Sequence, residues 1–190
     1  NQGTATVIIT GIGNYEGEII KTFTITKRII TVTAKEANKV YDKTPLTSDI
    51  PEVIVGSLAS GDTIEITTIG SQTVVGSSSN VVDTVIIKNQ KGENVTDNYT
   101  ITKVDGTLTV DPRPLTDSEI EVDDIPDYDF TGSQIKPKPG VRHVLFNETL
   151  EEGVDFTYDW GDNINTGENA GSVIINGIGN YSGSVTVLHN

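Results

Sequence analysis

Hydrophobic and polar side chains alternate with a period of two along much of the chain. Residues 30–34 (ITVTA) and 156–160 (FTYDW) show this alternation, and residues 172–175 (SVII) show it for Val173 and Ile175. A period of two is typical of a strand with one buried face. Turn residues such as Gly, Asn and Asp separate these runs. No window has a persuasive helical period, and residues 145–152 could form one helical turn at most. The pattern predicts an all-β protein.

A long internal repeat divides the chain into similar parts. Residues 4–15 (TATVIITGIGNY) reappear at 170–181 (AGSVIINGIGNY), and a more diverged copy ends at the Asn98-Tyr99 pair. The asparagines of the three Asn-Tyr pairs, Asn14, Asn98 and Asn180, are 84 and 82 residues apart (98 − 14 and 180 − 98). This spacing indicates one structural unit of about 80 residues, seen three times in the same phase.

The phase of the repeat sets the expected domain boundaries. Each Asn-Tyr pair is followed by one last strand, at 22–26, 106–110 and 183–188. Residues 1–28 are therefore expected to be the C-terminal strands of a truncated preceding repeat, 29–111 a complete repeat, and 112–190 a second one. Pro112 and Pro114 stiffen the joint between the two. The 1–28 hairpin should pack on the 29–111 repeat or pair with another molecule through its open edge. Several short strands in about 80 residues favour a small β-sandwich.

Three segments of the 29–111 repeat resemble a known family. KVYDKTPLT at 39–47, GDTIEI at 61–66 and NYTITKVDGTLTV at 98–110 are similar to the MBG or "YDG" repeats of bacterial surface adhesins. Lys43 departs from the family pattern, which has Gly at that position. YDFTGSQIKPKP at 128–139 and GIGNYSGSV at 177–185 resemble a related repeat of Gram-positive gut bacteria.

The resemblance implies an immunoglobulin-like β-sandwich, with a β-grasp unit as the alternative. It also implies a cell-surface or secreted, extracellular repeat protein with adhesive or spacer duties and no catalytic residues. Its partners would be neighbouring repeats of the same chain and, for an adhesin, host or cell-wall glycans or mucin and matrix proteins.

Composition narrows the range of partners. The net charge of −14 and a pI near 4.3 argue against binding nucleic acid. No apolar run reaches the ~18 residues that a membrane-spanning helix needs. The chain has no Cys, which excludes disulfides, thiol catalysis and Cys-ligated zinc. An internal Lys–Asn isopeptide bond could replace disulfides, but no local motif selects among Lys39, Lys88 and Lys103.

No catalytic site is predicted. His143 alternates with apolar neighbours and is interpreted as the outer face of a strand, and His189 lies one residue from the end. A glycosidase pair could be drawn among the carboxylates of residues 155–168, but a small sandwich rarely forms the cleft that such a pair needs. The acidic run at 121–124 is interpreted as a solvated strand edge.

Two segments remain as candidate ligand sites. The loop 159–168 carries oxygen ligands that could hold Ca²⁺, although Asn, Asp and Gly also suit tight turns and the EF-hand spacing is absent. The candidate calcium ligands are Asp159, Asp162, Asn163, Asn165 and Glu168. Phe156, Tyr158 and Trp160 should share one face. That face would stack on sugar rings if it points outward, and it forms core if it points inward, which an aromatic-poor domain favours.

The repeated tyrosines Tyr15, Tyr99 and Tyr181 are predicted to bury their rings and bond their hydroxyls to backbone, in the manner of a tyrosine corner. Taken together, the sequence predicts a non-enzymatic adhesin or stalk segment of a bacterial surface protein. The alternative is a carbohydrate-binding accessory module of a secreted glycan-degrading enzyme.

Overall fold

The structure is built almost entirely from β-strands. The computed structural model describes residues 2–49 and 51–190, so Asn1, the first residue of the predicted 1–28 segment, and Ile50 lie outside it. Within that described part, the helical content is one 3-10 turn, η1 (Thr96–Asn98), and no helix is long and apolar enough to span a bilayer. The predicted all-β class is confirmed. The strands are β1 (Gly3–Thr10), β2 (Glu18–Ile25), β3 (Arg28–Ala34), β4 (Ala37–Val40), β5 (Pro51–Val55), β6 (Thr63–Ile69), β7 (Gly76–Lys88), β8 (Tyr99–Val104), β9 (Gly106–Asp111), β10 (Arg113–Pro114), β11 (Ile120–Val122), β12 (Val141–His143), β13 (Glu148–Thr149), β14 (Phe156–Trp160), β15 (Gly171–Gly177), β16 (Tyr181–Ser182) and β17 (Ser184–His189).

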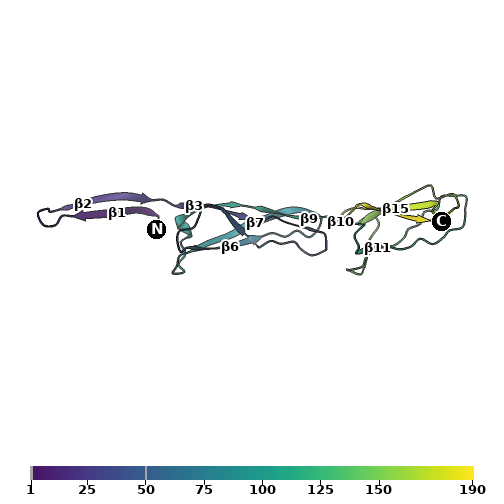
Figure 1. Ribbon diagram of the computed structural model, residues 1–190, viewed down its shortest axis with the longest axis horizontal. Helices are drawn as coiled ribbons and strands as arrows, with labels where there is room; N and C mark the ends of the chain where they lie inside the picture. The colour runs from purple at the N-terminus through teal and green to yellow at the C-terminus, as the bar shows by residue number, and fades with distance from the viewer. Residues whose placement is uncertain (1, 50) are drawn as a thin grey trace. The chain divides into compact units, whose positions relative to one another are not determined.

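The strands, drawn in Figure 1, pair in several small sheets, and some of the pairings recur in the two repeats. In the first repeat the sheets have the orders β5-β3-β8 and β4-β9-β7-β6. In the second they have the orders β14-β15-β17 and β11-β12-β13, with a separate β10-β16 pair. The strand that opens each repeat lies parallel to the strand that begins at the tyrosine of the Asn-Tyr pair, with Arg28 opposite Tyr99 and Arg113 opposite Tyr181. The immunoglobulin-like or β-grasp form of the repeat stays a prediction.

Close contacts divide the chain into two compact units that interleave along the sequence. Unit 1 comprises Asn1–Ala37, Thr47–Ser71 and Ser78–Leu108, and unit 2 comprises Asn38–Leu46, Gln72–Ser77 and Thr109–Asn190. Two loops within residues 29–111, 38–46 and 72–77, therefore pack in unit 2. Packing units and sequence repeats are different divisions, and the repeat boundaries at 28 and 111 stay a prediction.

The predicted strand 30–34 becomes the centre of the unit 1 core. Ile30, Val32 and Ala34 are buried, while the two threonines between them are partly exposed, as a period of two requires. These side chains pack with residues from β7 and β8, because β3 pairs in parallel with β8 and the strands share one buried face. The buried members of this cluster are Ile30, Val32, Ala34, Val82, Ile87 and Tyr99.

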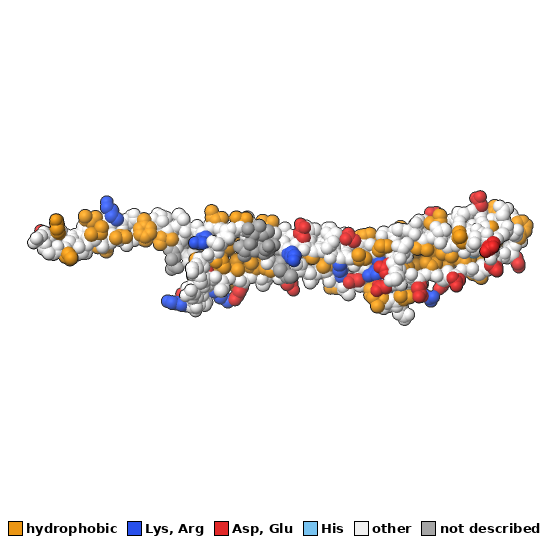
Figure 2. Space-filling view, viewed as in Figure 1, with side chains coloured by type: hydrophobic (Ala, Val, Ile, Leu, Met, Phe, Trp, Pro, Cys, Tyr) orange, Lys and Arg blue, Asp and Glu red, His pale blue; other side chains and the backbone are white. Residues whose placement is uncertain are grey.

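The hairpin β1–β2 is a separate two-stranded ribbon, drawn in purple in Figure 1. Its side chains are exposed on both faces, apart from a half-buried Ala5. Figure 2 shows hydrophobic side chains on its surface, and Phe23 is 53% exposed. The prediction that this hairpin packs on the 29–111 repeat is wrong, because its apolar side chains meet no core. Pairing with another molecule stays a prediction.

The GIGNY motif is a turn that brings two backbone segments into close approach. A Cβ on Gly177 would lie 2.6 Å from the backbone nitrogen of Ser182, and one on Gly11 would lie 2.8 Å from that of Glu16. The second glycine of each motif has a positive φ, 68° at Gly13 and 62° at Gly179. The motif therefore recurs because a side chain fits at neither glycine.

Candidate functional site

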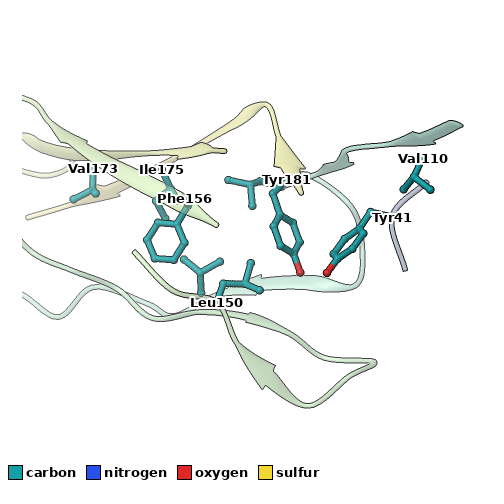
Figure 3. Close-up of a cluster of buried hydrophobic side chains, with 9 residues drawn as sticks. Tyr41, Val110, Leu150, Phe156, Val173, Ile175 and Tyr181 are labelled. Atoms are coloured by element: carbon teal, nitrogen blue, oxygen red, sulfur yellow. The ribbon is translucent and has the colours of Figure 1, made fainter. Parts of the chain in front are cut away.

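Tyr41 of the YDKT motif lies in the hydrophobic core of unit 2. Its ring is 8% exposed and meets Tyr181 edge to face, with the ring centroids 5.9 Å apart. Figure 3 shows the two rings side by side, with Leu150 and Phe156 further into the same cluster. Edge-to-face pairs of this kind add about 0.5–1.5 kcal/mol beyond area burial. The motif that carries the family resemblance thus completes a core made mostly by residues 109–190.

Polar contacts hold the Tyr41 loop in place. The Arg113 side chain donates from Nε to the Tyr41 carbonyl at 2.9 Å, and Tyr41 donates its N–H to the Asp111 carbonyl at 2.8 Å. Lys39 lies 2.5 Å from the Asp42 carboxylate, which also accepts from the Thr44 N–H. The Lys39 hydrogen bond holds the pKa of Asp42 at about 2. The loop is therefore a pre-formed structure.

Lys43 departs from the glycine of the YDG pattern that this segment resembles, and its backbone conformation is one that suits glycine. Its φ is 65°, a left-handed conformation that a side chain disfavours. The lysine in turn gains contacts, since its ammonium binds Glu148 and lies 5.8 Å from the centre of the Phe146 ring. Both partners belong to unit 2, so Lys43 adds contacts between the loop and the rest of that unit.

The tyrosines of the three Asn-Tyr pairs differ in their burial. Tyr99 and Tyr181 are buried, as predicted, whereas Tyr15 is 80% exposed, so the prediction for it is wrong. The Tyr99 hydroxyl accepts from the Ala59 N–H at 2.9 Å and donates to Asp62 at 2.6 Å. The buried Tyr181 hydroxyl has no hydrogen-bond partner in the described residues, and burial raises its pKa to about 12. A backbone hydrogen bond of the predicted kind thus forms at Tyr99 alone among the three.

The asparagines of two pairs receive the same kind of hydrogen bond. Asn98 accepts at Oδ1 from the Gln2 N–H at 2.9 Å, and Asn180 accepts at Oδ1 from the Val75 N–H at 3.0 Å. Gln2 and Val75 each precede a glycine that opens a strand, Gly3 or Gly76, with φ of 133° and 134°. In both places, then, the side chain of an Asn-Tyr pair binds the strand entry of the repeat before it.

Phe156, Tyr158 and Trp160, the candidate sugar platform, point inward. Phe156 is buried, and Tyr158 and Trp160 are partly buried against the unit 2 core. Tyr158 donates its hydroxyl to the Pro139 carbonyl, and Trp160 donates from Nε1 to the Pro137 carbonyl at 2.8 Å. The ammonium of Lys136 covers the Trp160 ring at 5.2 Å from its centre. The 136–139 segment thus covers part of the Tyr158 and Trp160 rings, which favours the core role over a sugar platform.

The candidate calcium loop is organised by Asn163. Its Nδ2 donates to the carbonyls of Ile135 and Ser172, both at 3.0 Å, and its Oδ1 accepts from the Ser172 N–H at 2.7 Å. Its φ of 47° shows that it also serves the turn. Asp159 accepts from Asn176, while Asp162, Asn165 and Glu168 are exposed. Among the described residues no three His, Cys, Asp or Glu side chains are gathered for a metal ion.

The interpretation of His143 as an outward residue is wrong. The side chain is 0% exposed and lies against the Phe146 ring, with centroids 4.1 Å apart. Burial lowers the pKa of His143, and the positive charge of Arg113 acts in the same direction, whereas Glu119 at 3.8 Å opposes it. Neither ring nitrogen has a hydrogen-bond partner in the described chain. Burial outweighs the Glu119 contact, so the residue is a neutral core side chain.

The lysines named for an isopeptide bond have other partners. Lys39 binds Asp42, Lys88 binds Glu65, and Lys103 donates to the Asp83 carbonyl. The acidic run at 121–124 has the predicted exposure, and Arg142 from the neighbouring strand β12 pairs with it through Glu121. These contacts are those of an ordinary charged surface.

The candidate functional site that the structure adds is an open pocket of about 330 Å³ in unit 2. Its aromatic walls are Tyr128, 42% exposed, and Phe130, 64% exposed. His189 lies edge to face with Tyr128, 6.0 Å between centroids, and its buried Nε2 has no hydrogen-bond partner in the described residues. The His189 ring is nearly buried, although the residue lies one position from the end of the sequence. The polar rim includes Asp127, Asn165, Thr166, Glu168 and Asn190.

The sequence did not predict this pocket, because the aromatic residues expected to bind a ligand were those of a strand, residues 156–160. Tyr128 and Phe130 lie in an Asp-rich segment that forms no strand. Aromatic side chains outside a period-two run have no sheet face to cover. That signal could have identified them as surface residues.

Comparison with known proteins gives one match. The MBG domain (YGX type) family matches residues 30–109. No curated protein and no solved structure matches the chain significantly. The match covers the YDKT loop with Tyr41, the buried part of strand β3 from Ile30 onward, and the Asn98-Tyr99 pair. Residues 30–109 of this chain therefore match the MBG domain family, as the sequence resemblance predicted.

Proposed function

We propose that this chain is a non-enzymatic stalk or spacer segment of a bacterial cell-surface or secreted repeat protein. The observation that carries the proposal is the burial of Tyr41, a residue of the MBG repeat, in the core of unit 2. In tandem-repeat proteins, stability is a sum of repeat terms and nearest-neighbour terms. Because the unit 2 core includes Tyr41 from the preceding repeat, the nearest-neighbour contribution to the free energy of unfolding is large. Such coupling suits a segment that transmits load along a chain.

Composition and family support the same role. MBG domains are generally non-catalytic modules of bacterial surface repeat proteins. The net charge of −14 keeps such a segment soluble and discourages association with other polyanions. Of the carboxylates considered for glycoside chemistry, Asp155 accepts from the Glu151 N–H in a turn at 2.9 Å, and Asp159 accepts from Asn176. The spacer role needs no ligand.

A second candidate function is favoured by the Tyr128 pocket. Exposed aromatic rings beside Asp, Asn and Glu side chains are a common way to bind sugars, because rings stack on the apolar sugar face while the polar groups bind hydroxyls. A carbohydrate-binding accessory module of a glycan-degrading enzyme, or an adhesin, would use this pocket rather than the Trp160 face. Its ligands would be host or cell-wall glycans or mucin.

A binding screen separates the two functions. The full chain is applied to a glycan array, to mucin and to matrix proteins, beside the double variant Tyr128→Ala, Phe130→Ala. A spacer gives signals no higher than the double variant does. Specific binding that the double variant loses would move the function to carbohydrate recognition and overturn the spacer proposal.

A mechanical measurement tests the spacer role directly. The full chain is stretched between its ends, and the force at which unit 2 unfolds is compared with that of Tyr41→Ala and of the matched control Tyr15→Ala. The spacer proposal expects a lower force for Tyr41→Ala and an unchanged force for Tyr15→Ala. Equal forces for all three proteins would contradict it.

A further inference from the structure

Unit 2 exposes a loop around Tyr128 whose counterpart in the preceding repeat is buried. The exposed apolar residues there are Tyr128, Phe130 and Ile164, the last 43% exposed. All three line the 330 Å³ pocket. The corresponding loop of the preceding repeat, around Tyr41, is covered within the core of unit 2. The surface that covers the Tyr41 loop therefore suggests what could cover the exposed Tyr128 loop.

The two loops correspond in sequence. YDKTPL at 41–46 aligns with YDFTGSQI at 128–135, so that Tyr41 matches Tyr128 and Lys43 matches Phe130, with two residues added before the apolar end. The strands that precede them correspond too, because Arg28 and Arg113 hold the same register opposite Tyr99 and Tyr181. Tyr41 and Tyr128 are therefore the same position of successive repeats.

The loops also correspond in their backbone contacts. Leu46 at the end of the first loop donates its N–H to the Gln72 carbonyl at 2.8 Å, and Ile135 at the end of the second donates to the Asn163 carbonyl at 3.0 Å. Gln72 and Asn163 each lie between corresponding strands, because the order β6-β7-β9 of the first repeat recurs as β14-β15-β17. The second loop thus shares this backbone hydrogen bond with the first, but its aromatic side chains are exposed.

We propose that the Tyr128 loop is a docking face for a following β repeat. Its occupant is the front edge of a repeat of the 112–190 type, which carries an Arg on its first strand and a Tyr after Asn at its last turn. Arg113 and Tyr181 supply these two groups to Tyr41, through the Tyr41 carbonyl and the ring contact. Tyr128 would make the same contacts with the next repeat. This inference rests on the proposed stalk function and deepens it by naming the joint.

The observations favour a protein occupant over a sugar. The equivalent loop already receives a protein surface in this same chain, and its aromatic partner is a tyrosine ring. Phe130 replaces the charged Lys43, whose neighbour in the occupied joint is the Phe146 ring, so a phenylalanine there would meet an aromatic side chain. An exposed apolar cluster of this kind marks an interaction site.

The test uses an extended chain and a single introduced thiol. A second copy of residues 113–190 is joined directly after Asn190 of the full chain, and Phe130→Cys is introduced in the first copy. The natural chain has no Cys, so the labelling rate with a thiol reagent reports position 130 alone. Val154→Cys, a position in unit 2 that is 57% exposed and outside the loop, is the matched control.

The proposal expects the thiol of Phe130→Cys to react at least about tenfold more slowly in the extended chain than in the 190-residue chain, as a docked state favoured by that factor requires. The thiol of Val154→Cys should react equally in both. Adding Tyr128→Ala to the extended chain should restore the rate at position 130. An unchanged rate at position 130, or an appended copy that circular dichroism shows to be unfolded, would overturn the proposal.

Sugars provide the competing outcome. Glycans taken from the binding screen are added to the 190-residue chain that carries Phe130→Cys. Protection of this thiol by a sugar would assign the face to carbohydrate and overturn the docking proposal. Glycan binding that leaves the thiol reactive would contradict the stalk function while leaving the slowed labelling in the extended chain as support for the joint. The two proposals can therefore fail separately.

Discussion

Two tyrosines at the same position of successive repeats use their hydroxyl groups in opposite ways. Tyr99 shares its hydroxyl between the Ala59 N–H and the Asp62 carboxylate, whereas the Tyr181 hydroxyl is buried without a partner in the described chain. A buried polar group without a hydrogen bond costs free energy, whereas a satisfied one stabilises the fold modestly. The same side chain should therefore respond differently to loss of its hydroxyl in the two repeats.

Tyr181→Phe should leave the free energy of unfolding of unit 2 unchanged or raised by up to about 1 kcal/mol, since no hydrogen bond is lost. Tyr99→Phe should lower that of unit 1 by about 1–3 kcal/mol, because it leaves the Ala59 N–H and the Asp62 carboxylate without their partner. Urea unfolding followed by Trp160 fluorescence reports unit 2, which contains the sole tryptophan, and amide exchange of β3 reports unit 1. A larger loss for Tyr181→Phe than for Tyr99→Phe would contradict the assignment of the hydroxyls.

His143 makes the stability of unit 2 depend on pH. Burial lowers the pKa of the folded residue, while the unfolded chain takes up its proton near pH 6.5. Below about that pH the unfolded state binds more protons than the folded state, so stability falls on acidification and is fully present above it. Asp42, with its pKa at about 2, does not titrate between pH 5 and 7.

The free energy of unfolding of unit 2 should fall between pH 7 and pH 5, with a slope from His143 of at most about 1.4 kcal/mol per pH unit. His143→Leu should flatten this slope, because the variant has no proton to take up on unfolding. Trp160 fluorescence in urea, repeated at several pH values, measures both proteins. A variant that keeps the full slope would assign the pH dependence to other groups.

At the scale of the elements, the repeated GIGNY turn is defined by close approach of two backbone segments. Gly177 faces the Ser182 backbone, which continues from Tyr181 into strand β16. Strand β16 in turn pairs in parallel with β10. A shift of the GIGNY turn would therefore move β16 and disturb its pairing with β10, the strand that opens the repeat.

Gly177→Ala should destabilise unit 2 by about 1–3 kcal/mol, the usual cost of overpacking, because a Cβ would lie 2.6 Å from a backbone atom that has no flexible end to move. Gly183→Ala is a useful contrast, since space is open there but its φ of 72° disfavours a side chain. Its cost should come from the backbone alone, about 1 kcal/mol. Thermal unfolding monitored at Trp160 ranks the two, and an equal or smaller loss for Gly177→Ala would contradict the contact argument.

At the scale of the whole molecule, packing units cut across the MBG repeat. Ile30 and Tyr41 both lie in the family-matched segment 30–109, yet Ile30 is buried in unit 1 and Tyr41 in unit 2. Neighbouring residues of one sequence repeat therefore stabilise different compact units. Unfolding experiments on the full chain can distinguish the two contributions.

Tyr41→Ala should lower the free energy of unfolding reported by Trp160 by about 3–5 kcal/mol, as expected for truncation of a large buried aromatic side chain. Ile30→Ala should cost about 2–5 kcal/mol in the amide exchange of β3, with a smaller effect on the Trp160 signal. Tyr15→Ala truncates an exposed tyrosine, so it should change neither the Trp160 signal nor the amide exchange of β3. An Ile30→Ala effect on Trp160 larger than that of Tyr41→Ala would contradict the division into units.

Much of the local structure follows from the sequence. Alternation over 30–34 and 156–160 identified strands β3 and β14 and the buried side of each, because a strand places alternate side chains on opposite faces. The aromatic-poor composition favoured Phe156, Tyr158 and Trp160 as core, and they do pack inward. The prediction for His143 is wrong, because alternation separates two faces of a strand without showing which is buried. A polar side chain favours the outer face, yet His143 lies on the inner one.

What the sequence determined by itself is the all-β class, the repeated motif and the family of residues 30–109, all of which depend on local order along the chain. Only the tertiary structure decided that Tyr41 joins the core of unit 2, that the β1–β2 hairpin meets no core, and that Tyr128 is left uncovered. The physical reason is that burial depends on which distant strands pair. The tyrosines of related motifs, Tyr15, Tyr99 and Tyr181, are buried or exposed according to their neighbours.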